Sequence, residues 1–298
     1  LDECQEHARE LSSWTAGYLR QVRDYPVLPD VQPGFLALPG SAPEQGEPFD
    51  RIFSDFVSLI LPGVTHWNHP RFFAYFSVSA SPAGILGEML AAALNLNGML
   101  WKSSPSLTEL ELKVTDWLRQ WMGLPDGWMG LIYDTASVST LHALAAAREV
   151  ADPECREEGF RRGLVVYCSA QAHSSVDKAA IALGFGRHYI RHIPVDSEFR
   201  MIPSELARAI REDREAGLRP CAAVATVGTT STTSVDPVRA IAEVCRDEGV
   251  WLHVDAAYGG ACALVEDTRR YLDGADLADS LVVNPHKWLF TPIDCSVL

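Results

Sequence analysis

Three features that often reveal a protein's surroundings are missing from this 298-residue chain. Its seven cysteines are an odd number and form no CxxC pair, which indicates reduced thiols in a cytoplasmic protein rather than a disulfide framework. No apolar stretch is long enough to span a bilayer, so no membrane partner is expected. Basic runs are also missing, and 39 acidic against 25 basic residues give a formal charge of −14. We therefore expect no nucleic-acid partner.

Residues 1–80 are predicted to form an N-terminal helical and extended arm. Apolar residues recur at helical spacing up to about residue 24, which predicts an amphipathic helix. Residues 26–48 are rich in proline and glycine, a composition typical of a segment without regular structure. The apolar face of the arm would be hard to bury in a monomer, so we expect the arm to serve in dimerisation.

A different rhythm begins at Gly130. Short apolar strands such as GLVVYCS, CAAVATVG, WLHVD and SLVVN alternate with helical stretches. This order predicts an α/β fold, with a mostly parallel sheet flanked by helices. Right-handed crossovers place the carboxyl ends of such strands on one edge, where open α/β sheets bind ligands. Residues 81–298 are therefore expected to form one large α/β domain with a site at that edge.

Two residues at strand ends carry the strongest chemical signal. Lys287 follows the apolar run SLVVNPH, and Asp255 ends WLHVD. A lysine at the end of a core strand is a candidate for Schiff-base chemistry, because desolvation lowers its pKa and frees its amine. A carboxylate facing a pyridine nitrogen keeps that nitrogen protonated. These are the two protein groups that pyridoxal phosphate (PLP) most needs, whereas the alternatives are a surface lysine and an aspartate that caps a turn.

Three other strand-to-helix connections hold polar candidates. Residues 134–150 begin a helix with small hydroxyl residues, where the backbone N–H groups of Ala136 and Ser137 could cradle a phosphate, although a simple helix cap is commoner. His173 could stack on a pyridine ring, or be a loop histidine without a role. The hydroxyl-rich run 225–237 could supply donors to a ligand, or be a flexible loop.

Two weaker patterns are set aside. His188 and His192 have metal-like spacing, but in a strand they would share one wet face, so no metal is expected. Gly184 and Gly186 follow a helix rather than a strand, so a dinucleotide site is not supported.

Seven segments, taken in order, resemble the group II PLP-dependent amino-acid decarboxylases of fold type I, most closely the aromatic-L-amino-acid decarboxylases. They are HWNHPRFFAYF, SPSLTELE, TASVSTL, AQAHSSVDKA, ATVGTTSTTSVDP, LHVDAAYGG and NPHKW. The resemblance covers nearly the whole chain and implies a PLP-dependent transferase-like fold with PLP as cofactor. It also implies a cytoplasmic homodimer that decarboxylates an aromatic L-amino acid to the corresponding amine and CO₂.

The resemblance gives each site residue a role. Lys287 would hold PLP as a Schiff base, Asp255 would pair with the pyridine nitrogen and His173 would stack on the ring, which makes these three the expected catalytic residues. The remaining expected contacts with PLP are Ala136, Ser137, Thr230, Ala257, Asn284 and His286. The expected substrate contacts are Trp67, Tyr75 and Phe76, and residues 97–101 would complete the pocket of a partner subunit.

The chain departs from the family pattern in two ways. Asp134 and Val138 stand where the family usually has glycine and glutamate, and a carboxylate beside a phosphate repels it. The chain also ends soon after Lys287, before the family's mobile loop and small C-terminal domain. The alternatives are therefore an aromatic aldehyde synthase of the same family, an inactive fragment, or one part of a split decarboxylase that assembles with a separate C-terminal polypeptide.

Overall fold

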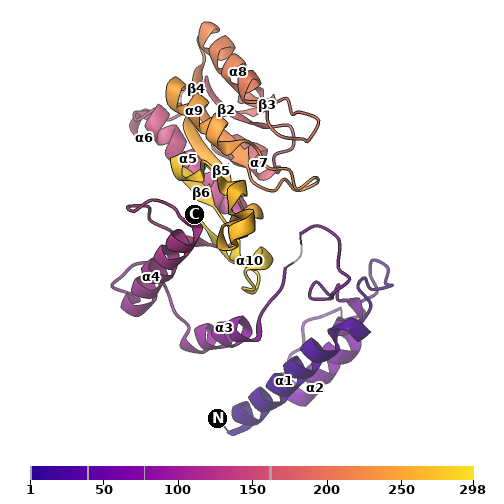
Figure 1. Ribbon diagram of the computed structural model, residues 1–298. Coiled ribbons are helices and arrows are strands. Elements are labelled where there is room, and N and C mark those ends of the chain that lie inside the picture. The colour runs from indigo at the N-terminus through magenta and orange to yellow at the C-terminus, as the bar shows by residue number, and fades with distance from the viewer. Residues whose placement is uncertain (1, 39, 77, 161–162) are drawn as a thin grey trace. The chain divides into compact units, whose positions relative to one another are not determined.

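The computed structural model describes residues 2–38, 40–76, 78–160 and 163–298 (Figure 1). The chain divides into two compact units, Leu1–Ser77 and Val78–Leu298. The second unit holds the sheet and all the strands of the described residues.

Aromatic side chains hold the N-terminal unit together. Helix α1 (Asp2–Gln21) meets helix α2 (Phe49–Asp55) where Trp14 lies edge-on to Phe53 and Phe56, with ring centroids 6.0 and 5.3 Å apart. Residues 25–38 and 40–48 between them contain neither helix nor strand, as their proline content predicts. This unit also holds three short helical segments: the 3-10 helices η1 (Val22–Asp24) and η3 (Leu61–Gly63) and the π-helix η2 (Phe56–Ile60).

Five parallel strands form the sheet of the second unit, which confirms the predicted mostly parallel α/β fold. Their order is β3-β2-β4-β5-β6. The strands are β2 (Leu164–Ser169), β3 (Ile190–Ile193), β4 (Arg219–Thr226), β5 (Trp251–Asp255) and β6 (Ser280–Val282). Each strand is joined to the next by a helical crossover, so all five carboxyl ends lie at one edge (Figure 1).

The segment around GLIYD does not join this sheet as a further parallel neighbour. Its strand β1 (Ile132–Tyr133) pairs antiparallel with β7 (Ser296–Val297). Strand β7 in turn bonds to the end of β6, because the Val297 N–H donates to the Val283 carbonyl at 2.8 Å and the reverse bond is 2.9 Å. The chain therefore inserts β7 between β6 and β1, and β7 runs against all its neighbours.

Helices cover both faces of the sheet, and the alternation of side chains along each strand explains how. On one face Val166, Cys168 and Val224 pack with buried residues of α5 (Ala136–Ala151) and α7 (Ser175–Ala182). On the other face Val165 and Tyr167 pack with α8 (Pro203–Glu215) and α9 (Val238–Glu248). A strand covered on both faces reads as a continuous apolar run, which is why these segments were recognisable in the sequence.

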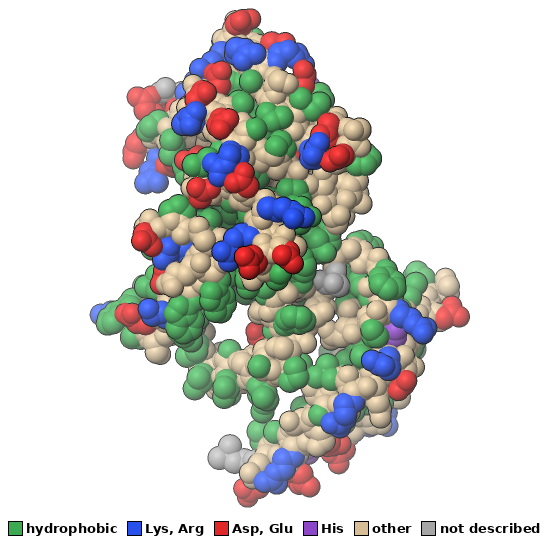
Figure 2. Space-filling model, viewed as in Figure 1, with side chains coloured by type: hydrophobic (Ala, Val, Ile, Leu, Met, Phe, Trp, Pro, Cys, Tyr) green, Lys and Arg blue, Asp and Glu red, His purple; other side chains and the backbone are tan. Residues whose placement is uncertain are grey.

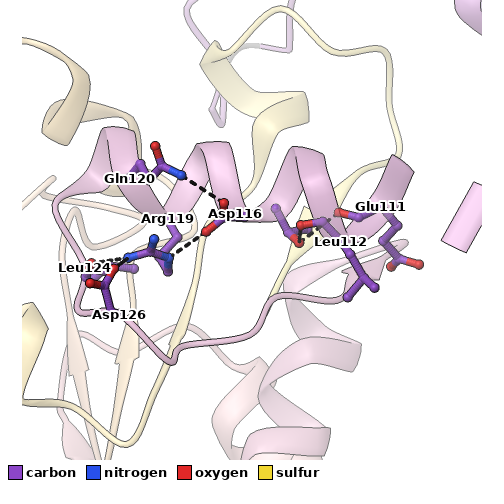
Figure 3. Close-up of polar contacts among 8 residues, drawn as sticks. Glu111, Leu112, Asp116, Arg119, Gln120, Leu124 and Asp126 are labelled. Carbon is purple, nitrogen blue, oxygen red and sulfur yellow. Dashed lines mark hydrogen bonds and ion pairs between the residues drawn. The ribbon is translucent and has the colours of Figure 1, made fainter. Parts of the chain in front are cut away.

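Helices α3 and α4 come first in the second unit, before strand β1. Helix α3 (Pro82–Leu94) has Ser81 as its N-cap and no buried residue. Helix α4 (Pro105–Met122) carries a polar row on one side, where Arg119 bonds to Asp116 at 2.9 Å and pairs with Asp126 at 3.0 Å (Figure 3). No helix in the described part of the chain is both long and apolar enough to cross a membrane.

Short helical elements connect the rest of the second unit. They are α6 (Cys155–Glu158), η4 (Arg187–Tyr189), η5 (Gly259–Leu264), η6 (Glu266–Leu272), η7 (Ala275–Leu277) and α10 (Pro285–Trp288). The last of these carries the lysine that the sequence singles out.

Candidate cofactor site

Adjacent parallel strands deliver the predicted residues to one edge of the sheet. Asp255 ends β5, Asn284 comes two residues after β6, and His173 follows β2. Thr230 follows β4 in an exposed turn. Because neighbouring parallel strands end side by side, these residues share the edge at which open α/β sheets bind ligands.

Lys287 is half-buried in the single turn of α10. Burial lowers the pKa of its amine, and the negative charge of Asp255 acts in the opposite direction. The two side chains therefore lie close enough for one charge to act on the other. A lysine with a lowered pKa has a larger uncharged fraction at neutral pH, which is the form that attacks a carbonyl carbon.

Asp255 is buried, with 5% of its surface exposed. Its Oδ1 accepts the backbone N–H of Ala257 at 3.1 Å. Its backbone carbonyl accepts the N–H of Val227 at 2.9 Å, which ties the end of β5 to the end of β4. A buried carboxylate needs a positive partner or donor, and a protonated pyridine nitrogen is such a partner.

His173 presents an imidazole whose orientation is fixed from one side. Its Nδ1 accepts the backbone N–H of Ser175 at 3.2 Å and lies 2.9 Å from the Ser175 hydroxyl. An Nδ1 that accepts leaves the ring proton of the neutral form on Nε2. Burial lowers the pKa of the His173 ring. The negative charge of Asp255 raises this pKa, and the positive charges of Lys287 and Lys178 lower it. The charges of Lys287 and Asp255 thus both reach His173.

The N-terminus of α5 is open to an anion. Thr135 is its N-cap but makes no side-chain capping bond, in contrast to Ser81, whose hydroxyl accepts the Gly84 N–H at the start of α3. The amides of Ala136 and Ser137 are the first of the helix. Unpaired amides and the helix dipole at such a position favour a phosphate.

Asn284 and His286 stand beside Lys287 as a buried polar pair. The Asn284 amide nitrogen lies 3.4 Å from His286 Nε2, and His286 Nδ1 accepts the Cys295 N–H at 2.9 Å. Burial lowers the pKa of His286, and the positive charge of Lys287 lowers it further. Asn284 Oδ1 is buried and has no hydrogen-bond partner among the described residues. An orphaned buried acceptor is costly, so this atom indicates a donor supplied by a ligand.

The expected substrate residues lie in the N-terminal unit, where Trp67 and Tyr75 form an aromatic group with Phe72. Trp67 stacks on Tyr75 with ring centroids 5.7 Å apart and lies 4.4 Å from the ring of Phe72. Tyr75 is 83% exposed, whereas Phe76 is half-buried. Their approach to the cofactor residues of the second unit stays a prediction.

The model of the pyridoxal-dependent decarboxylase conserved domain matches residues 33–298. Aromatic-L-amino-acid decarboxylase of Bos taurus is 41% identical over 99% of this chain and 64% of its own length. Phenylacetaldehyde synthase of Arabidopsis thaliana is also 41% identical, over 100% of this chain and 62% of its own length. The solved structure of Oryza sativa TDC with PLP and tryptamine superposes with a TM-score of 0.96 at 38% identity, over 100% of this chain and 63% of that one.

The chain belongs to the pyridoxal-dependent decarboxylase family. The family resemblance seen in the sequence is thereby confirmed, and so is the fold-type-I architecture. The chain spans less than two thirds of the length of these curated relatives. PLP is the cofactor of the family, and the residues present fit it. The uncapped start of α5 suits its phosphate, Asp255 suits its ring nitrogen, and Lys287 suits its aldehyde.

Sequence reasoning passed over a second buried acid near the site. Asp236 is 1% exposed and accepts the backbone N–H of Met201 at 2.7 Å and that of Thr226 at 2.8 Å. Burial raises the pKa of this carboxyl to about 6. Through these two bonds Asp236 links the end of β4 to Met201. The only signal in the sequence is an aspartate before a proline at the end of that loop, which an ordinary turn would also show.

Proposed function

We propose that this chain carries the cofactor-binding core of a PLP-dependent carboxy-lyase that converts an aromatic L-amino acid to its amine and CO₂. The observation that carries the proposal is the half-buried Lys287, whose pKa burial lowers, at the edge where Asp255 is also buried. A lysine whose pKa is lowered by burial is typical of a catalytic site, and a lysine together with an aspartate is the pair that PLP chemistry uses.

The side chains divide the work as follows. When bound, PLP draws the electrons of the breaking bond between Cα and the carboxylate into its ring. Burial lowers the pKa of the Lys287 amine, which favours the uncharged form that attacks a carbonyl and accepts a proton. Buried Asp255 stabilises positive charge on a ring nitrogen. His173 offers a ring whose Nδ1 accepts the Ser175 N–H, which leaves Nε2 to carry the proton of the neutral form.

An aromatic substrate is supported by the aromatic group around Trp67. Its ring stacks on that of Tyr75 at an angle of 20°, and most of Tyr75 is exposed to meet a further ring. Aromatic pairs of this kind contribute about 0.5–1.5 kcal/mol beyond the area they bury, which favours an aromatic over an acidic side chain. The name of the Bos taurus relative agrees with this choice.

A separate observation supports a second candidate reaction, the synthesis of an aldehyde. The Arabidopsis thaliana relative, an aldehyde synthase, matches this chain at the same 41% identity as the Bos taurus decarboxylase. In that reaction the amino acid, O₂ and water would give aldehyde, CO₂, ammonia and hydrogen peroxide. The two reactions share loss of CO₂, so the remaining products distinguish them.

We further propose that a second copy of the chain covers the apolar surface of α3 and α4. Leu86, Leu90 and Leu94 of α3 are 55%, 65% and 66% exposed. Hydrophobic side chains gather over α3 and α4 in Figure 2. The segment 97–101 between these helices adds Met99 and Trp101, which are 76% and 57% exposed. Contiguous apolar surface of this kind marks an interface, and a two-fold dimer is the commonest solution.

The test combines turnover with cofactor capture. Carboxyl-labelled tryptophan, tyrosine, dopa, phenylalanine, histidine and glutamate are offered with PLP, and CO₂, amine, aldehyde and peroxide are measured together. In parallel, borohydride reduction and peptide mass mapping identify the lysine that captures PLP. Lys287→Ala should lose both readouts, whereas Lys113→Ala, which removes an exposed lysine of α4, should keep them.

Each outcome has a defined meaning. CO₂ with amine supports the decarboxylase, and CO₂ with aldehyde and peroxide supports the synthase. Capture on Lys287 without turnover would reject activity of this chain alone and leave the fragment and split-enzyme alternatives. Capture that is equal in Lys287→Ala and the wild type would overturn the site itself.

A further inference from the structure

Tyr258 and Trp288 join two loops of the cofactor site. Their rings stack with centroids 4.9 Å apart and an angle of 13° between the planes. The indole N–H of Trp288 also donates to the backbone carbonyl of Tyr258. Tyr258 belongs to the loop after β5, and Trp288 is the last residue of α10. Both residues stand in segments that carry the family resemblance, LHVDAAYGG and NPHKW, but neither is among the expected site residues.

Lys287 needs such support because α10 cannot supply it. A four-residue helix forms a single turn, and helices of that length have no independent stability in water. A lysine side chain adds a flexible stem of four carbons to a turn that is not stable by itself. The structure anchors the residue on each side of Lys287: His286 accepts the Cys295 N–H at 2.9 Å, and Trp288 is held by Tyr258.

The anchor of Trp288 lies on the loop that starts at Asp255. In the same loop the Ala257 carbonyl accepts the Asn284 N–H at 3.1 Å, so the loops are bonded before and after Lys287. The nitrogen and the aldehyde-bearing carbon of PLP lie at opposite ends of its ring. A lysine that reaches one end while Asp255 meets the other must therefore be held at a fixed separation from Asp255.

The ring of Tyr258 also packs against Gly228. A Cβ placed on Gly228, which has φ of +87°, would lie 2.9 Å from Cδ1 of Tyr258. The tyrosine ring thus packs directly against the backbone of Gly228, which cannot rearrange as a side chain would. Tyr258 also lines a cavity of about 870 Å³ together with Cys262 and Tyr271, so one part of it remains reachable from outside the site.

We propose that Tyr258 and Trp288 are positioning residues that set the separation of Lys287 from Asp255 and so govern covalent capture of PLP. The proposal rests on the proposed function, because it assumes that Lys287 captures PLP. It predicts a specific defect. Loosening the stack should impair capture by Lys287 while leaving the phosphate and ring contacts of the cofactor in place.

Pyridoxamine phosphate separates these two contributions. It fills the same contacts as PLP but has no aldehyde, so Lys287 cannot capture it. The readout is the ratio of its dissociation constant to that of PLP, measured by titration of the chain. In Trp288→Leu, which removes ring and N–H, this ratio should fall at least about 10-fold, since lost orientation of a reacting group has effects of that order or more.

Three further variants sharpen the result. Trp288→Phe keeps an aromatic ring and loses the hydrogen bond, so it should recover part of the ratio. Tyr258→Leu keeps the carbonyl and loses the stack, so it should reproduce part of the defect. Tyr271→Leu removes the other tyrosine of the same cavity, for which no stacking on Trp288 is seen, and should leave the ratio within about twofold of the wild type.

The outcomes are distinct. An unchanged ratio in Trp288→Leu would overturn the proposal. This includes the case in which Trp288→Leu and Tyr258→Leu lose the same affinity for both compounds, which indicates general damage to the site. If Trp288→Leu does not fold, as judged by its urea unfolding curve, the ratio in Trp288→Phe and Tyr258→Leu decides. A wild-type chain that binds neither compound would instead refute the proposed function.

Discussion

His253 Nδ1 lies 2.9 Å from the hydroxyl of Ser280, which faces it across the pairing of β5 with β6. The same hydroxyl accepts the indole N–H of Trp251 at 2.9 Å. His253 is fully buried, and burial lowers its pKa to about 4 against the opposing charge of Asp255. The ring is therefore neutral in the folded chain, two residues before the acid that is proposed to meet the cofactor.

The first prediction concerns acid stability. The folded pKa of His253 is about 4 and the unfolded value about 6.5, so only the unfolded chain takes up a proton as pH falls from 6.5 towards 4. The contribution of His253 to the free energy of unfolding is complete above the unfolded pKa and is lost as the pH falls through this window. The loss is about 2 kcal/mol between about pH 7 and about pH 5. Asp236, whose raised pKa is about 6, changes stability in the opposite direction.

Comparison of the wild type with His253→Gln isolates this effect, because Asp236 is present in both. Urea unfolding at the two pH values should show the smaller loss in His253→Gln. Equal losses in the two proteins would mean that His253 is protonated in the folded chain, contrary to its burial. The comparison uses the difference between two pH values, so a constant cost of the substitution cancels.

The second prediction concerns Asp134, an exposed carboxylate just before the uncapped start of α5. A negative side chain there repels the phosphate of PLP, although water and salt screen much of the effect. Asp134→Asn should bind PLP about threefold more tightly at physiological salt, with a smaller gain at about 0.5 M salt. Val138 offers no charge at the same helix turn.

Equilibrium titration with PLP at low and high salt checks this expectation. Asp267→Asn removes another exposed acid, from η6, and should not alter the affinity. If Asp134→Asn binds no more tightly than the wild type at low salt, Asp134 turns away from the phosphate and the α5 assignment loses its electrostatic argument.

The third prediction concerns self-association. Leu86 and Leu90 lie one helical turn apart on α3 and share one apolar stripe. Replacing both with lysine places two charges in the proposed dimer interface and should convert a dimer to a monomer. Light scattering coupled to size exclusion reports the mass directly. Val150→Lys charges an exposed apolar position on α5 and should leave the mass unchanged.

A monomeric wild type at micromolar concentration would contradict this prediction at once. So would a dimer that survives both substitutions, because two buried unpaired charges are too costly for an interface to retain.

Much of the second unit was predictable because its chemistry lies at the ends of recognisable strands. The apolar runs before Asp255 and Lys287 are buried strands, and their parallel order brings both residues to one edge. Strand β7 was missed, because two residues such as Ser296 and Val297 are too short for any periodic signal. Its direction depends on hydrogen bonds to Val283 that no local pattern encodes.

Contacts between side chains were beyond reach for a related reason. The stack of Tyr258 on Trp288 depends on how two loops approach each other, not on the composition of either loop. Likewise, the sequence marks His253 only as one residue of the run WLHVD. Its lowered pKa follows from complete burial under the helical layer, which is a property of the assembled fold.

The insertion of β7 between β6 and β1 also orders events during synthesis. Ser139 at the start of α5 and Ser296 of β7 share a buried hydrogen bond of 2.9 Å across a separation of 157 residues. Until Ser296 and Val297 emerge from the ribosome, β1 has no strand to pair with, and α5 lacks the hydrogen bond to Ser296. Contacts of such long range form late. The start of α5, where we propose that the phosphate binds, therefore gains this bond only after Lys287 has already been made.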